Sequence, residues 1–533
     1  MRGSSASGFA TFTLLPSIFW VTRRTLATLG VLTLIGAAGA WSLAVAAPGS
    51  VAQPPVFRVL VGTPQGQAIA PDFLGLALEY RDIPALVGTD PKAVNPVLVQ
   101  LIRNLVPKGR PMLRIGGQST DRSWWPVRGV AQPRGVSYSL TPSWTASARA
   151  LAQAANARLT LGLGLEANQP KLDAVEAYEL LRRIGRRYVE ALEIGNEPEL
   201  YTAFPWYRTL HGAILPWYRS IGAPIFSRPR GYNPQAFLAE FSRAVQAVPR
   251  AAIAGPATGN PLWLGQFARI LSPASRVKVI TWHAYGLNQC IKVRSSPYYP
   301  TVPNLLSPLA SRGIVNGISP SVALAHRAGA SFRVGELGSV TCNGKLGVSN
   351  TFASALWATD ALFSIAADGV DGINLHTFQN AANGLFDFQR SGGHWQATVH
   401  PLYYGVLMFA QAAPPGSRLL RLSAPNQTQV RVWATQAPDR RIRVLLINDS
   451  LTHAEPATVR APAAAGPASL ERLLGRSAYA TSPDTLGGQS FGTRTASGLL
   501  APQRSTAIAP RGGRYAVTLP AASAALLTLS PGH

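Results

Sequence analysis

Short apolar segments alternate with longer segments of helical periodicity between residues 70 and 400. The helical segments include 171–187 and 351–367. Most apolar segments are almost continuously apolar, which is typical of parallel strands covered on both faces. Eight of them have the length and composition of strands: 73–80, 112–116, 159–165, 189–194, 251–255, 277–283, a segment that begins at 332–334, and 369–375.

Eight strand–helix repeats predict an α/β fold, a (β/α)8 barrel of the TIM type. An open, doubly wound sheet is the alternative. The sequence lacks the glycine fingerprint of a dinucleotide site, because Gly162 and Gly164 lie inside a strand and no phosphate-binding turn follows them. The barrel is therefore favoured.

Beyond residue 402 the pattern changes to short strands separated by Gly, Pro, Asn and Asp. Examples are 429–434, 441–448 and 515–519. This texture predicts a C-terminal all-β sandwich at 403–533, after a barrel at 67–402. A strand within residues 48–66 precedes the barrel, and we expect it to pair with the sandwich.

Residues 1–47 are typical of an export segment. Arg23 and Arg24 precede an uncharged apolar stretch that ends in small residues before Pro48. This order describes a secretory signal peptide, and the stretch is also long enough to span a bilayer as an uncleaved anchor. We therefore expect an exported protein, which is secreted, periplasmic or anchored outside the cytoplasm.

The composition is that of an ordered globular protein, with 47% apolar and 14% charged residues. Lys and Arg number 49 against 24 Asp and Glu, which gives a formal charge of +25. The basic residues are scattered, with no dense run interleaved with aromatics, so we expect no nucleic-acid partner. A solvated basic surface and an acidic glycan partner remain as alternatives.

Cys290 and Cys342 are the two cysteines of the chain. In an exported protein a disulfide between them is favoured over two unpaired thiols. It would close a loop of about 50 residues and contribute on the order of 4 kcal/mol in the chain-entropy model. No Cys/His cluster has the spacing of a metal site, so we expect no metal and no cofactor.

Glutamates stand after two of the predicted barrel strands, at the end where such barrels carry their catalytic side chains. Glu197 follows the fourth strand within Asn196-Glu197-Pro198, and Glu336 ends the seventh. Glycosidic cleavage needs one protonated carboxyl for the leaving oxygen and one ionised carboxylate at the reacting carbon. The pair therefore predicts a glycoside hydrolase. The alternative is a surface-loop Glu197 and a Glu336 that pairs with Arg333 or Arg114.

Further polar residues follow the other strands. Tyr285, after the sixth, could pack in the core or donate a hydrogen bond that keeps Glu336 ionised. His283 and His376 are interpreted as hydrogen-bonded histidines of the inner barrel and not as catalysts. The remaining candidates near the strand ends are Glu79, Arg114, Gln118 and Gln379.

Several motifs spread over the barrel resemble glycoside hydrolase family 79, the β-glucuronidase and heparanase-like group. The resemblance covers about residues 55 to 530. The motifs are Leu113-Arg114-Ile115-Gly116-Gly117 with Thr120-Asp121, Ile194–Pro198, Trp282-His283-Ala284-Tyr285, Gly335-Glu336, Gly347–Trp357 and His400–Gly405.

The resemblance implies a retaining mechanism with Glu197 as general acid/base and Glu336 as nucleophile. The two carboxyls would then lie about 5 to 5.5 Å apart. It further implies three kinds of contact: Asn196 with the sugar 2-hydroxyl, Tyr285 with the nucleophile, and Glu79 and Gln118 with distal hydroxyls. Arg114, His283 and Gln379 would support the site.

Members of the family bind the uronate carboxylate through a loop beyond the nucleophile that carries an aromatic hydroxyl and consecutive glycines. Here the loop is Thr341-Cys342-Asn343-Gly344, in which the backbone N–H groups of Asn343 and Gly344 could cradle a carboxylate. Phe386 stands where relatives carry a tyrosine near the eighth strand. A disulfide between Cys290 and Cys342 would fix this loop beside Glu336.

The sequence thus predicts a β-glucuronidase-like hydrolase that acts on a glycan or glycoconjugate without a cofactor. A glycosidase of the same barrel clan that takes a neutral sugar is one alternative. A non-catalytic glycan-binding protein is another, although retention of both glutamates argues against it.

Overall fold

The computed structural model describes residues 56–208, 224–425, 429–464, 466–482 and 484–532. The expected export segment at 1–47 lies outside these residues. Within the described ranges, every helix is too short or too polar to cross a membrane.

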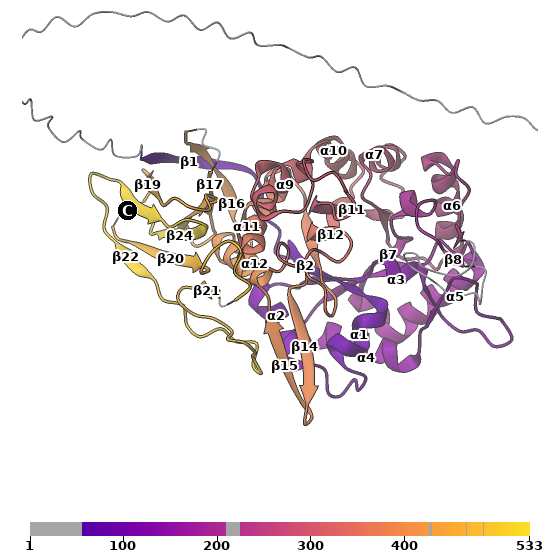
Figure 1. Ribbon diagram of the computed structural model, residues 1–533. Helices are drawn as coiled ribbons and strands as arrows, with labels where there is room; N and C mark the ends of the chain where they lie inside the picture. The colour runs from indigo at the N-terminus through magenta and orange to yellow at the C-terminus, as the bar shows by residue number, and fades with distance from the viewer. Residues whose placement is uncertain (1–55, 209–223, 426–428, 465, 483, 533) are drawn as a thin grey trace, which may run out of the picture. The chain divides into compact units, whose positions relative to one another are not determined.

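Eight parallel strands close into a barrel, in the order β2, β3, β6, β7, β10, β11, β12 and β13, with β13 pairing back onto β2 (Figure 1). The predicted fold class is therefore confirmed. The strands β11 and β12 extend beyond their predicted ends and carry the pocket side chains with them. The strand bounds are Leu74–Glu79, Met112–Gly116, Arg158–Leu163, Val189–Ile194, Ile253–Thr258, Val277–Leu287, Ser331–Val340 and Gly372–His376.

Helices cover the outside of the barrel, and side-chain caps start several of them. The caps Asn95, Thr141, Asn233 and Asn260 each accept hydrogen bonds from backbone N–H groups of the first turn, with proline at the next position. The longer helices are α2 (Pro96–Leu105), α4 (Pro142–Ala154), α5 (Pro170–Leu180), α6 (Pro234–Ala247), α7 (Pro261–Arg269), α10 (Ser319–Arg327), α11 (Phe352–Ala367) and α12 (Pro401–Ala412).

The helix predicted at 171–187 is shorter than expected. The α-helical part α5 ends at Leu180, and a π turn over Leu181–Gly185 and a 3-10 turn over Arg186–Tyr188 follow. Gly185 lies at a φ of 97°, a conformation outside the α-helical region. This glycine therefore ends the regular helical path just before β7.

A ten-stranded sheet follows the barrel, and the N-terminal strand β1 (Phe57–Ala68) lies inside it. β1 pairs antiparallel with β16 (Arg418–Ser423) and parallel with β19 (Glu455–Arg460). Side chains from both ends of the strand order share one apolar core, so the sheet folds back on itself as a sandwich. Further strands are β17 (Val430–Gln436), β18 (Ile442–Asn448), β20 (Ala468–Leu474), β23 (Tyr515–Leu519) and β24 (Ser523–Leu529).

The boundary predicted between residues 402 and 403 falls inside α12. This helix belongs to the barrel and packs against α11, and the next strand of the sheet starts only at Arg418. Tyr403 and Met408 on α12 are fully buried, as are most of its residues. A helix that is apolar on all faces lacks the amphipathic period that would mark it in the sequence.

The crossing of α11 and α12 depends on Gly405. A Cβ atom at this position would lie 2.1 Å from the backbone oxygen of Ala355. Gly405→Ala therefore forces the two helices apart, and we expect it to lower the free energy of unfolding by about 1–3 kcal/mol in chemical denaturation. Gly265→Ala in α7 is the control, because open space surrounds Gly265. Equal losses of stability in both variants would contradict this account of the packing.

Candidate active site

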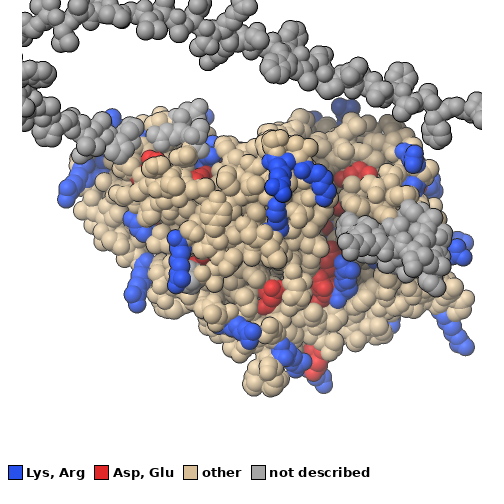
Figure 2. Space-filling view, viewed as in Figure 1, with Lys and Arg blue, Asp and Glu red and all other residues tan. Residues whose placement is uncertain are grey.

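A pocket of about 320 Å³ opens where the barrel strands end. Figure 2 shows a band of acidic side chains on the viewed face, with a few more elsewhere, and Lys and Arg scattered over the same face. The pocket is lined by residues that follow seven of the eight strands: Glu79, Arg81, Gln118, Asp121, Arg122, Glu166, Asn196, Glu197, Leu200, Tyr201, Phe204, Tyr285, Asn288, Cys290, Glu336, Thr341, Cys342, Asn343, His376, Phe378 and Asn383.

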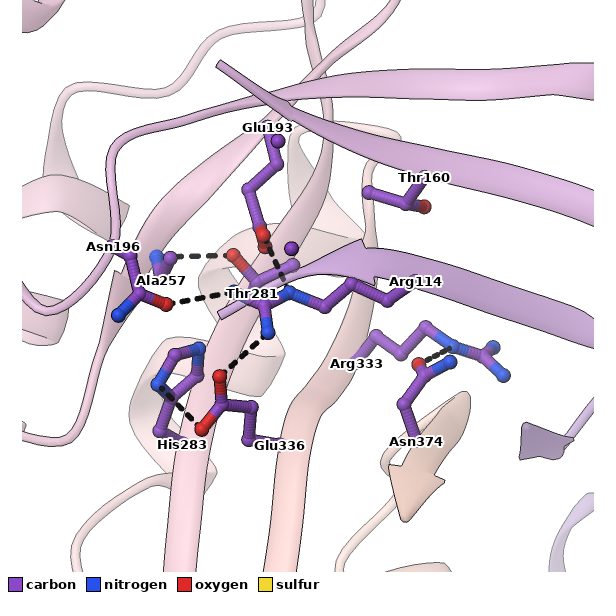
Figure 3. Close-up of polar contacts among 12 residues, drawn as sticks. Arg114, Thr160, Glu193, Asn196, Ala257, Thr281, His283, Arg333, Glu336 and Asn374 are labelled. Atoms are coloured by element: carbon purple, nitrogen blue, oxygen red, sulfur yellow. Dashed lines mark hydrogen bonds and ion pairs between the residues drawn. The ribbon is translucent and has the colours of Figure 1, made fainter. Parts of the chain in front are cut away.

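Glu336 is buried on β12, with 3% of its surface exposed, and is held by charged and polar neighbours. Its Oε1 lies 2.7 Å from Nη1 of Arg114, and its Oε2 accepts a hydrogen bond of 2.8 Å from the Tyr285 hydroxyl (Figure 3 shows the Arg114 contact). Burial by itself would raise the pKa of this carboxyl. The charges of His283, His376 and Arg114 outweigh burial and hold the pKa well below its usual range. Glu336 is therefore ionised.

Arg114 joins three acceptors inside the barrel (Figure 3). Besides Glu336, its Nε lies 2.5 Å from Oε2 of Glu193 and its Nη2 donates to Oδ1 of Asn196 over 2.9 Å. The ion pair considered in the sequence thus forms with Arg114, while Arg333 donates to Asn374 instead. Glu336 lines the pocket while it is paired with Arg114, so the pairing is compatible with the predicted functional role.

Glu197 stands directly after β7 in a left-handed conformation with φ of 47°. Such a conformation is uncommon outside glycine and is held here by a hydrogen bond of 2.7 Å from the Glu197 N–H to the Ala257 oxygen. Its side chain is 28% exposed, in contrast to the 4% of Glu336. One carboxylate oxygen of each glutamate and a ring nitrogen of His283 lie within 4.8 Å of one another.

The two histidines contact the carboxylates, so their interpretation as purely structural residues is incomplete. Nδ1 of His283 lies 3.2 Å from Oε1 of Glu197 and 3.6 Å from Oε2 of Glu336. Nδ1 of His376 lies 2.9 Å from the Tyr285 hydroxyl. Because that hydroxyl gives its one proton to Glu336, His376 donates to the hydroxyl oxygen. Burial alone would lower the pKa of both histidines. The negative charge of Glu336, together with Glu197 for His283 and Glu79 for His376, outweighs burial and raises the pKa of both rings.

Glu79 lines the pocket at the end of β2 but is largely occupied by the protein itself. Its carboxylate accepts from the N–H groups of Gln118, over 3.2 Å, and Ser119, over 2.8 Å. Gly117 makes room for it, since a Cβ there would lie 2.1 Å from Oε1 of Glu79. Gln118 also lines the pocket, whereas Gln379 does not: its side-chain amide exchanges two hydrogen bonds with the backbone of Phe388.

The loop expected to cradle a carboxylate uses one of its two predicted N–H groups for an internal hydrogen bond. Cys342, Asn343 and Gly344 all have positive φ angles, and the Gly344 N–H donates to the Thr341 oxygen over 3.3 Å. That N–H is therefore used within the loop, and only Asn343 of the predicted pair lines the pocket. Phe386, which stands where relatives carry a tyrosine, is fully buried in the core and is not among the residues that line the pocket.

The structure brings the two cysteines together at the pocket. Cys290 follows β11 and Cys342 follows β12, and their Sγ atoms lie 3.1 Å apart as free thiols. The disulfide itself stays a prediction, and its position at the rim fits the expectation that it fixes this loop.

A disulfide would protect both thiols from alkylation. In protein purified without reductant, we expect no alkylation of Cys290 or Cys342 before reduction and a single cross-linked peptide pair by mass spectrometry. Cys290→Ser is the control, since it should expose one reactive thiol. Two thiols that are alkylated without reduction in the unmodified chain would contradict the bond.

Sequence reasoning missed a second acidic part of the pocket. Glu166 directly follows β6 and lies 3.9 Å from Nη2 of Arg122, while Asp121 accepts hydrogen bonds from the N–H groups of Leu165 and Glu166. Burial, and after it the charge of Asp121, raises the pKa of Glu166 to about 8. The signal was present, because Glu166 is the first residue after the third predicted strand, 159–165.

Among the described residues, one group of three offers ligand atoms close enough for a metal ion: Glu197, His283 and Glu336. These atoms already contact one another, with Nδ1 of His283 between the two carboxylates. A proton on His283 is attracted by both carboxylates, so we assign no metal or cofactor to this group.

Removal of Arg114 tests the electrostatics of the site. Arg114→Gln leaves Glu193 and Glu336 buried without their cation, and we expect the free energy of unfolding to fall by about 3–5 kcal/mol in chemical denaturation. The control is Arg158→Gln, which breaks a pair with Glu190 whose side chains are 40% and 29% exposed and should cost less than about 1 kcal/mol. Similar small losses in both variants would refute the central place of Arg114.

No protein-family model and no curated protein matches this sequence. Solved structures match its fold over 89% of this chain and the whole of each matched chain. They include a 4-O-α-L-rhamnosyl-β-D-glucuronidase from Fusarium oxysporum 12S (19% identity, TM-score 0.63). A family 51 arabinofuranosidase from Xanthomonas axonopodis pv. citri (15%, 0.62) and a family 30 endoxylanase from Clostridium papyrosolvens C71 (12%, 0.51) match as well. At these identities the fold is what is shared, and it is a fold on which several glycoside hydrolases are built.

Proposed function

We propose that this protein is a retaining glycoside hydrolase. The observation that carries the proposal is the position of Glu197 and Glu336, with one oxygen of each within 4.8 Å of the other. Retaining enzymes place their carboxyls about 5–5.5 Å apart, whereas inverting enzymes leave about 6.5–9.5 Å for a water molecule. The separation here is of the retaining kind.

The environments of the two carboxyls divide the labour between them. Glu336, ionised beside Arg114 and oriented by Tyr285, attacks the anomeric carbon, and the bond to the leaving oxygen breaks. Glu197, more exposed, donates its proton to that oxygen. In the second step Glu197 takes a proton from water, the water oxygen attacks the anomeric carbon, and Glu336 leaves as a carboxylate.

For the sugar we propose a β-linked uronic acid on a glycan or glycoconjugate outside the cytoplasm. Two arginines, Arg81 and Arg122, line the pocket and could attract an acidic substrate. Asn343 remains from the predicted carboxylate loop. The glucuronidase among the structures of the same fold makes this sugar a reasonable first substrate to test.

A neutral sugar is the second candidate, and the lining of the pocket favours it in one respect. Five carboxyl side chains line the pocket against two arginines, Arg81 and Arg122: Glu79, Asp121, Glu166, Glu197 and Glu336. Arg114 already serves Glu336, and the Gly344 N–H is used within its loop. An acidic surplus disfavours a negatively charged ring unless some of these carboxyls are protonated.

Hydrolysis of aryl β-glucuronide, β-glucoside and β-xyloside tests both the mechanism and the sugar. We expect Glu336→Gln to lower kcat/KM on the active substrate by at least about 10³-fold, because the nucleophile is lost. Glu197→Gln should lose about 10²–10⁴-fold on substrates with poor leaving groups and much less on those that need no proton. Proton NMR of the first product should show the β anomer.

The matched control is Glu190→Gln, a change of the same chemistry at the opposite end of β7. It should leave the rates of hydrolysis unchanged. Equal rates for the unmodified protein and Glu336→Gln would reject the catalytic assignment, and an α-anomeric first product would reject retention. Activity confined to the neutral glycosides would keep the mechanism and reject the uronic acid.

A further inference from the structure

A third carboxyl lies behind the pocket beside Glu197. Glu199 follows two residues later, in the 3-10 turn Pro198–Leu200. Its Oε1 accepts a hydrogen bond of 2.6 Å from the N–H of Gly259, and the side chain of Thr258 bonds to it as well. Its Oε2 is buried, and no hydrogen bond joins it to another described residue. Glu199 is not among the residues that line the pocket.

The contacts of Glu199 fix the segment that carries Glu197. The N–H of Glu197 bonds to Ala257 and the carboxylate of Glu199 bonds to Gly259, so two points of the turn attach to the end of β10. Glu197 needs this support because its left-handed φ of 47° is unfavourable for a residue with a side chain. The attachment sets the direction in which the Glu197 side chain leaves the backbone.

No ion pair compensates the charge of Glu199 among the described residues. From its own turn it faces Glu197, and from the end of β10 it faces the uncharged Thr258 and Gly259. Strand β11 also passes close to this place. A Cβ atom built on Gly259 would lie 3.6 Å from Oε1 of Glu199 and equally far from the backbone oxygen of His283. The His283 ring contacts Glu197 and Glu336 instead.

Two neighbouring carboxyls without a shared cation do not ionise independently. Burial, and after it the negative charge of Glu197, raises the pKa of Glu199 to about 7. The repulsion between the two carboxylates is mutual, so two negative charges on this turn are less favourable than one.

We propose that Glu199 is a positioning residue for Glu197: its carboxyl anchors the turn that aims Glu197 into the pocket, and its negative charge disfavours a second charge on Glu197. This inference rests on the proposed hydrolase. It assigns no contact between Glu199 and the substrate.

Glu199→Gln separates the two parts of the proposal, because the amide oxygen still accepts from Gly259 while the charge is gone. We expect the alkaline limb of kcat/KM to move to lower pH by about one unit, with the activity at the acidic optimum largely kept. The shift should be confined to substrates whose leaving group needs a proton. Glu199→Ala also removes the anchor and should lower kcat at every pH. Glu190→Gln is the control and should leave the pH profile unchanged.

An alkaline limb of Glu199→Gln that superimposes on that of the unmodified protein would overturn the proposal. A second measurement does not need activity: infrared titration of the carboxylic-acid band in the unmodified protein and in Glu197→Gln. If the pair is coupled, loss of the Glu197 charge moves the neutral-range titration of Glu199 to lower pH, and an unmoved titration overturns the coupling. A protein that hydrolyses no glycoside yet shows this movement would reject the proposed function and keep the coupled pair.

Discussion

The buried guanidinium of Arg114 is the interaction on which the rest of the site depends. Two carboxylates, Glu193 and Glu336, are far too costly to bury alone, and Arg114 makes both possible while it also holds Asn196. The barrel interior supplies the rigid setting, since Arg114 and Glu336 come from strands on opposite arcs of a closed sheet. An ionised Glu336 inside an apolar barrel is the consequence.

Glu336 and Glu197 differ in their charged neighbours and in their exposure. Glu336 is surrounded by positive charge and by the Tyr285 hydroxyl, so it stays ionised. Glu197 is more exposed and has His283 on one side and the acidic Glu199 behind it. The contrast between these two environments is the physical basis of the roles proposed for them, Glu336 as the attacking carboxylate and Glu197 as the proton carrier. A chain with a net charge of +25 thus encloses a pocket with an excess of carboxyls.

The barrel could be predicted from sequence because its strands are apolar on both faces and its helices are capped in regular alternation. The same pattern placed Glu197 and Glu336 at strand ends, and the structure brings them together as that pattern required. The sequence pattern did not mark α12 as a barrel helix, because nearly all of its residues are buried. It also did not reveal that the Gly344 N–H donates a hydrogen bond to the Thr341 oxygen inside its own loop. Sequence reasoning also passed over Glu166, although that residue directly follows the predicted strand 159–165.

The sequence by itself determined the alternation of strands and helices, the position of the acidic residues along it and the closeness of the two cysteines that follow adjacent strands. These depend on local patterns and on the order of strands. Only the tertiary structure decided which arginine pairs with Glu336, that both histidines touch the carboxylates and that Glu199 binds the N–H of Gly259 at the end of β10. Those facts depend on the directions of side chains from distant strands and on burial, and neither is encoded in any local segment.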